Sequence, residues 1–250
     1  MPSPQSLAIL FAPILLLLLS CASRETGARA APALHPVTRD YTDPTNNRLI
    51  PTVLFGTGAG DPKPLAILAH GYGNLGTDYS FLTGELVSMG YVVAAPQFDL
   101  PDDPPLARDG DIVAGRMPAW ERGASGILQV AQALRQEGVA SETPILLVGH
   151  SNGGDIAMLL VKRHPEAAAA VFTLDNRRMA LPRTALTRVC SLRSSDFPAE
   201  PGVLPTAAEQ TEFNMLIRKA DNLRHDEMWD GANAAQKAMM IGTLRDCLDR

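Results

Sequence analysis

The segment from Ile145 to Gly154, ILLVGHSNGG, constrains the fold of this 250-residue chain more than any other. It begins with an unbroken apolar run and continues with Gly149-His150-Ser151-Asn152-Gly153, which fits the pattern G-x-S-x-G. Apolar residues then recur at helical spacing, so the segment predicts a buried strand, a tight turn and a helix. Side chains at the flanks of such a turn would clash, which accounts for Gly149 and Gly153 and leaves the hydroxyl of Ser151 exposed.

The rest of the chain alternates in the same way between short apolar runs and segments with helical periodicity. Continuous apolar runs favour strands that are buried on both faces of a parallel sheet. We therefore predict an α/β fold, a three-layer sandwich with helices on both faces of the sheet. The expected strands are near residues 65–69, 91–95, 145–148, 170–174, 189–192 and 215–217, and the expected helices near 79–89, 120–137, 152–163 and 232–248.

The first residues carry an export signal. Residues 7–19 are all apolar, a run too short to cross ~30 Å of hydrocarbon but typical of a secretory signal. We expect residues 1–21 to be removed, either as a plain signal, with an alternative cleavage near residue 30, or as a lipoprotein signal that leaves Cys21 lipidated. Residues 22–48 are interpreted as a tether and 49–250 as the folded domain. The mature protein is then periplasmic, secreted or attached to a membrane through Cys21, and a retained anchor is the other alternative.

Composition excludes several classes of function. The net charge of −5 leaves no excess of basic residues for phosphates, so we expect no nucleic-acid partner. Three cysteines are too few for a Cys-rich metal cluster, and the acidic segment 99–111 does not fit a calcium loop, so no metal is expected. After export, Cys190 and Cys247 could form a disulfide in an oxidising compartment. The alternative is two buried thiols.

A serine hydroxyl needs a general base, and only five histidines are available. His164 lies thirteen residues beyond Ser151 on the same predicted helix, roughly 20 Å away at ~1.5 Å per residue. His70 ends a predicted strand, and the side chain of His150 diverges from the serine within the turn. Elimination therefore favours His225, which precedes the last predicted helix.

The base needs a carboxylate to orient its ring, and two aspartates follow predicted strands between Ser151 and His225. We expect Asp196 to be this group, because its strand should lie nearer the last strand and therefore nearer His225. Asp175 is the alternative acid, and its other interpretation is a salt bridge with Arg177 or Arg178.

Acyl chemistry at Ser151 also requires donors for the oxyanion. The backbone N–H of Asn152 is expected to be one, at the start of the helix. The loop His70-Gly71-Tyr72-Gly73 follows an early strand, and Gly71 and Gly73 let its amides turn inward. The backbone N–H of Tyr72 is therefore the second expected donor.

Together these residues resemble the α/β-hydrolase superfamily, through HGYG, GHSNGG, Asp196 after a later strand and His225 before the closing helix. The loop and turn look most like the dienelactone-hydrolase, cutinase-like and acetylhydrolase branches, of an exported bacterial type. The resemblance implies a mostly parallel sheet of about eight strands and hydrolysis through an acyl-enzyme without a cofactor. Only residues 175–188 join two neighbouring strands where many relatives insert a cap, so we expect no substantial cap and an open site. Arg177 and Arg178 could bind an acidic group of the substrate there.

The expected function is hydrolysis of a small-molecule carboxylic ester by Ser151, His225 and Asp196. Acyl transfer or peptide cleavage on the same triad is one alternative, and a non-catalytic binding protein of the cell envelope is another. The sequence indicates neither the acyl group, nor the alcohol, nor the oligomeric state.

Overall fold

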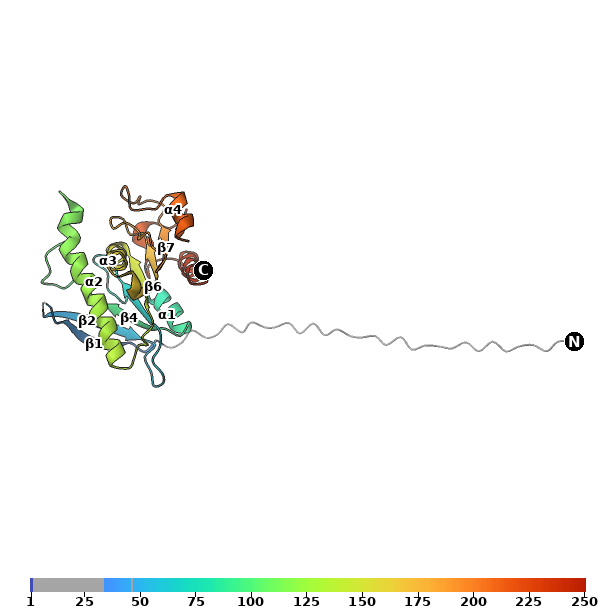
Figure 1. Cartoon of the computed structure of the whole chain (residues 1–250), viewed down its shortest axis with the longest axis horizontal. Coiled ribbons are helices and arrows are strands. Elements are labelled where there is room, and N and C mark those ends of the chain that lie inside the picture. The colour runs from blue at the N-terminus through green and yellow to red at the C-terminus, as the bar shows by residue number, and fades with distance from the viewer. Residues whose placement is uncertain (2–33, 46) are drawn as a thin grey trace. The chain divides into compact units, whose positions relative to one another are not determined.

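One eight-stranded sheet organises the computed structural model, which describes residues 1, 34–45 and 47–250 (Figure 1). The strand order is β1-β2-β4-β3-β5-β6-β7-β8, with antiparallel pairing of β1 with β2 and of β2 with β4 and parallel pairing elsewhere. This arrangement confirms the predicted mostly parallel sheet of about eight strands. The strands are β1 (Val37–Asp43), β2 (Arg48–Phe55), β3 (Leu65–Ala69), β4 (Val92–Pro96), β5 (Ile145–His150), β6 (Ala168–Leu174), β7 (Arg188–Arg193) and β8 (Leu216–Lys219).

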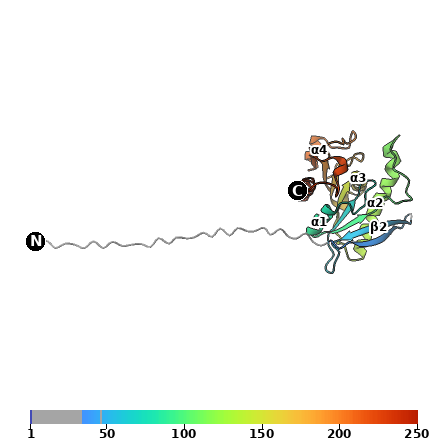
Figure 2. The same ribbon diagram turned by 180° about the vertical axis from the view of Figure 1, so that it is seen from behind.

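Helices cover both faces of the sheet, as a three-layer fold requires (Figures 1 and 2). Helices α2 (Ile112–Gln136) and α3 (Ser151–Arg163) contribute to one apolar cluster, and α1 (Ser80–Ser88) and α5 (Ala234–Leu248) contribute to the other. Every residue of β3, β4 and β5 is buried, which agrees with their unbroken apolar sequences. The short α4 (Ala207–Glu212) has no counterpart among the predicted helices.

The predicted boundary between tether and domain at residue 48 is wrong. Residues 37–43 form β1, and β2 begins at Arg48; the two strands pair antiparallel at the edge of the sheet. Only Tyr41 and Asp43 of β1 are buried, so this edge strand carries no apolar run that would have revealed it. The lipidation candidate Cys21 and the signal segment lie outside the described residues.

The site is not covered by a cap among the residues that the structure describes. The connection from β6 to β7 contains no helix, and no large insertion occurs there, as expected. Within the described ranges no helix is both long and apolar enough to cross a membrane.

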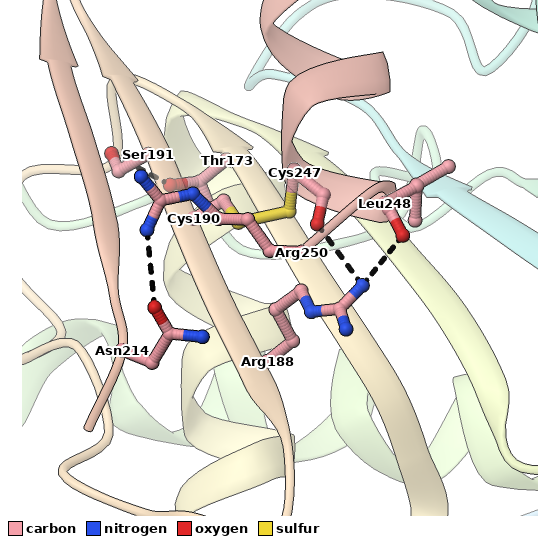
Figure 3. Close-up of a disulfide and its surroundings, with 8 residues drawn as sticks. All are labelled: Thr173, Arg188, Cys190, Ser191, Asn214, Cys247, Leu248 and Arg250. Atoms are coloured by element: carbon pink, nitrogen blue, oxygen red, sulfur yellow. Dashed lines mark hydrogen bonds between the residues drawn. A yellow bond between two sulfur atoms is a disulfide. The ribbon is translucent and has the colours of Figure 1, made fainter.

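A disulfide joins Cys190 of β7 to Cys247 of α5, with a Cα–Cα distance of 6.0 Å (Figure 3). Both residues are fully buried, and the bond ties the sheet to the last helix. Arg188 reinforces the junction, since its Nη1 donates to the carbonyl oxygens of Cys247 at 3.2 Å and Leu248 at 2.6 Å. Of the two alternatives for these cysteines, the structure therefore contains the disulfide.

Removing this disulfide is expected to lower the free energy of unfolding. The bond closes a loop with a sequence separation of 57, for which loss of chain entropy in the unfolded state amounts to about 4 kcal/mol. Urea unfolding of the wild type and of the double variant Cys190→Ser/Cys247→Ser, with and without reductant, measures the difference. Equal urea midpoints for the two proteins without reductant would contradict the stabilising role of the disulfide. The double variant, which has no disulfide to reduce, controls for other effects of the reductant.

Candidate active site

The turn that presents Ser151 has the geometry expected from its glycines. Ser151 follows β5 directly and has φ 51°, a left-handed conformation that a non-glycine residue seldom adopts. A Cβ at Gly153 would lie 2.2 Å from the carbonyl oxygen of Ala69, and one at Gly149 would lie 2.7 Å from that of Gly153. No larger residue fits at either position, so the packing of α3 against β3 and β5 fixes the direction of Ser151.

The imidazole of His225 meets the serine hydroxyl. His225 begins a short 3-10 helix, η2 (His225–Glu227), and its Nε2 lies 2.9 Å from Oγ of Ser151. The ring is largely buried, with its Nδ1 directed into the protein and its Nε2 toward the serine. The structure therefore brings together the two residues that the sequence paired by elimination.

The carboxylate that orients this ring is Asp175, so the preference for Asp196 is wrong. Oδ2 of Asp175 lies 2.7 Å from Nδ1 of His225, and the side chain is fully buried. Asp196 instead accepts a hydrogen bond from the backbone N–H of His225 at 2.8 Å and pairs with Arg224 at 3.2 Å. Asp196 therefore fixes the backbone at the start of η2 but does not contact the imidazole ring of His225.

Distance from the strand end explains the difference between the two aspartates. Asp175 is the first residue after β6 and has φ 55°, which turns its side chain over the edge of the sheet. Asp196 follows the end of β7 by three residues, and by then the chain has reached the surface. The side chain of His225 therefore extends past the end of β7 to contact Asp175 at the end of β6. The expected order of the strands does not indicate this contact.

Two residues at the end of β7, neither of them predicted, hold Asp175 in place. Ser194 donates its backbone N–H to Oδ1 at 3.0 Å and its hydroxyl to Oδ2 at 2.7 Å. The guanidinium of Arg193, itself almost fully buried, lies 2.8 Å from Oδ1. Burial raises the pKa of Asp175, but the hydrogen bond with His225, the charge of Arg193 and the bonds from Ser194 outweigh it, so the pKa lies below its usual value. The carboxylate is thus held ionised beside His225.

A second hydrogen-bond chain connects the HGYG loop to His225. The backbone N–H of Gly71 donates to the hydroxyl of Tyr79 at 2.9 Å, and this hydroxyl lies 2.8 Å from Nδ1 of His150. Nε2 of His150 lies 3.2 Å from the carbonyl oxygen of His225. The carbonyl oxygen of His225 can only accept, so Nε2 of His150 carries the proton, and in a neutral ring Nδ1 then accepts from the hydroxyl of Tyr79. This directed chain requires a neutral His150.

The electrostatics of His150 agree with that requirement. Burial, together with the nearby His225, lowers the pKa of His150 to about 3. Burial also lowers the pKa of His70, whose Nε2 accepts from the backbone N–H of Phe98 at 2.9 Å while its Nδ1 faces the carbonyl of Gly71. Both rings therefore serve as neutral supports of the loop, and the sequence predicted neither role.

Arg177 and Arg178, the candidates for binding an acidic substrate, have other contacts. Arg178 forms an ion pair with Glu200 at 3.0 Å. The guanidinium of Arg177 lies 3.3 Å from the ring centre of Phe197, and its Nε donates to the carbonyl of Pro198. Phe197 in turn packs on the ring of His225, with 4.6 Å between ring centres. We therefore interpret both arginines as structural, with Arg177 supporting the aromatic wall beside His225.

Comparison with known families identifies the chain. The family model for chlorophyllase matches residues 45–174, more than half of the 250 residues. The chain belongs to the chlorophyllase family. This family membership makes it an ester-acting hydrolase. A search of curated proteins finds no match.

Solved structures agree on the fold. A dienelactone hydrolase-like promiscuous phosphotriesterase from metagenomic libraries superposes with a TM-score of 0.66 at 13% identity, covering 86% of this chain and 98% of the other. The ferulic acid esterase of Streptomyces cinnamoneus gives 0.64 at 17% identity, covering 89% and 91%. A soluble variant of monoglyceride lipase from Saccharomyces cerevisiae gives 0.58 at 9% identity, covering 89% and 97%. The α/β-hydrolase fold inferred from the sequence is thereby confirmed.

The described residues contain no group of three or more histidine, cysteine, aspartate or glutamate side chains that could hold a metal ion.

Acid should weaken the folded state through His150. This side chain takes up a proton near pH 6.5 when unfolded but only near pH 3 when folded, so stability falls as the pH drops below 6.5. Between pH 7 and 5 the loss amounts to about 2 kcal/mol from this residue, and His150→Gln should remove it. Urea unfolding at both pH values measures the difference. The matched control is His164→Gln at an exposed histidine, and an unchanged pH dependence in His150→Gln would contradict the assignment.

Proposed function

We propose that the protein hydrolyses small-molecule carboxylic esters through an acyl-enzyme formed on Ser151. The observation that carries the proposal is the chain of contacts from Oγ of Ser151 to Nε2 of His225 and from Nδ1 of His225 to Asp175, at 2.9 and 2.7 Å. A nucleophile, a base in hydrogen-bond reach and a carboxylate that orients the base are the parts required for acyl transfer.

The mechanism follows from these contacts. Nε2 of His225 takes the proton of Ser151 as Oγ attacks the ester carbonyl carbon, and the buried carboxylate of Asp175 stabilises the imidazolium. The same Nε2–H then protonates the leaving alcohol as the C–O bond breaks. In the second half, His225 takes a proton from water, the hydroxide oxygen attacks the acyl carbon, and the proton returns to Oγ as the acid leaves.

The backbone amides of Tyr72 and Asn152 remain the proposed oxyanion donors. In the loop after β3, the amides of the neighbouring residues all have acceptors: Gly71 donates to Tyr79, Gly73 to Asp99, Asn74 to Gly71, Leu75 to Asp78 and Gly76 to Gln97. The amide of Tyr72 has no acceptor among the described residues. Asn152 lies in the first turn of α3, where N–H groups have no partner within the helix. Both amides are therefore available to an oxyanion.

We also propose that the mature protein is exported, with Cys21 as the site of attachment if the lipoprotein alternative holds. The disulfide between Cys190 and Cys247 supports export, because such bonds persist in oxidising compartments and are rare in reducing ones. The intact mass of the protein isolated from its cells tests the proposal. Recovery of the full-length, unlipidated protein from the cytoplasmic fraction would overturn it.

The first test concerns the nucleophile. We expect a fluorophosphonate probe to label the wild type at Ser151 and short-chain nitrophenyl esters to be hydrolysed. Ser151→Ala should lose the label and reduce kcat/KM roughly 10⁴-fold or more. Labelling that persists in Ser151→Ala would contradict the assignment, as would an intact protein that does not react. Faster cleavage of aminopeptide substrates than of esters would instead indicate a peptidase.

The second test separates the two aspartates. Asp175→Asn removes the charge at Nδ1 of His225 and should lower kcat roughly 10⁴-fold, the effect of this change in a triad of the same kind. Asp196→Asn keeps an acceptor for the backbone N–H of His225, so we expect a loss of about tenfold or less. Circular dichroism of both variants controls for folding. An equal loss in the two would leave Asp175 without a special role.

A further inference from the structure

A cavity of about 80 Å³ opens beside the proposed oxyanion donors. Tyr72 and Asn152 are among the residues that line it, and the others come from β1, β2, the loop after β4, α2 and α3. His225 does not line the cavity. Ser151 does not line it either, whereas both proposed oxyanion donors do. The oxyanion is the carbonyl oxygen of the acyl group, and the leaving alcohol must lie within hydrogen-bond reach of Nε2 of His225, so we assign the cavity to the acyl side.

Part of the lining of the cavity is apolar, and it includes a glycine of α2. Its apolar wall consists of Ile50, Phe98, Leu100, Leu106 and Ile156. A Cβ at Gly126 of α2 would lie 3.5 Å from Cδ1 of Ile50 and 3.8 Å from Cε1 of Phe98, ordinary contact distances. A methyl group could therefore be added there without a clash, and it would occupy part of the cavity.

The polar side chains of the cavity leave hydrogen-bond donors unused. The carboxylate of Asp103 already accepts from Arg48 and from the backbone N–H of Leu100. Arg122 of α2, in contrast, makes no hydrogen bond among the described residues; its Nε is buried without a partner and its ion pair with Asp103 is long, at 4.0 Å. A group that enters the cavity can therefore accept hydrogen bonds from the guanidinium of Arg122.

The side chain of Asn152 adds a second donor nearer the serine. Its Oδ1 accepts from Nε1 of Trp120 at 2.8 Å, which fixes the amide so that Nδ2 points away from Trp120. Nδ2 has no partner among the described residues. The charged residues of the lining, Asp43, Asp99, Asp103, Arg48 and Arg122, carry a net formal charge of −1, which disfavours an anion.

We propose that this cavity is the acyl subsite and that it selects short acyl groups ending in an uncharged oxygen acceptor, such as a ketone, which Arg122 binds. The inference rests on the esterase function proposed above and adds its substrate class. The size of the cavity limits chain length, its apolar wall holds the methylene groups, and the guanidinium recognises the terminal oxygen.

The test compares nitrophenyl esters of equal length: pentanoate, 4-oxopentanoate and hydrogen succinate, with acetate as reference. We expect the wild type to prefer 4-oxopentanoate over pentanoate by about tenfold in kcat/KM, as for a hydrogen bond to a charged group, and not to prefer hydrogen succinate. Arg122→Met should abolish this preference. Arg108→Met, at an exposed arginine that does not line the cavity, should retain it.

Gly126→Ala gives an independent readout of cavity size. Its added methyl group should lower the ratio of pentanoate to acetate hydrolysis several-fold, because acetate does not extend into the cavity. Equal rates for pentanoate and 4-oxopentanoate in the wild type would overturn the inference and leave the esterase function standing. A preference for hydrogen succinate, or a ketone preference that survives in Arg122→Met, would also overturn it. Failure to hydrolyse any ester would overturn the proposed function itself.

Discussion

The buried carboxylate of Asp175 is the interaction on which the arrangement of this site depends. An ionised carboxylate is costly to bury unless it is paired and fully hydrogen-bonded. Asp175 meets both conditions, since it is hydrogen-bonded to His225 and to the backbone and hydroxyl of Ser194 and forms an ion pair with Arg193. These partners come from β7 and from the loop before α5, so the same bonds that make the charge tolerable also bring three separate segments to one point.

The backbone contributes a second constraint at the same sheet edge. Ser151 and Asp175 are each the first residue after a strand, β5 and β6, and both adopt positive φ. Such conformations cost free energy in non-glycine residues and persist only where the surroundings impose them. Here the surroundings are the close contacts of Gly149 and Gly153 for Ser151 and the bonds from β7 for Asp175. The two side chains consequently diverge from their strands toward His225, which lies between them.

The sequence predicted those parts of the site whose signals are local. Ser151 stands in the five-residue pattern G-x-S-x-G, and the central strands are unbroken apolar runs, so both follow from the sequence alone. The sequence favours Asp196 over Asp175 as the carboxylate that orients His225. The correct choice depends on how far the side chain of His225 extends past β7, and this distance is set by tertiary contacts. The immediate position of Asp175 after β6, compared with three residues for Asp196, was a usable signal. No sequence signal indicates the roles of Arg193 and Ser194. The exposed edge strand β1 lacks the alternation of apolar and polar residues that would identify it as part of the domain.

The disulfide joins two elements that lie next to the contact between Asp175 and His225. Cys190 lies in β7, three residues before Arg193, and Cys247 lies in α5, the helix that follows the His225 loop (Figure 3). The bond therefore joins the strand that supports Asp175 to the helix that follows His225. It lies on the opposite face of the sheet from α2 and α3, which contribute to the lining of the cavity beside Tyr72 and Asn152. This covalent link therefore holds together the strand that carries Arg193 and the helix that follows His225, on the face of the sheet away from that cavity.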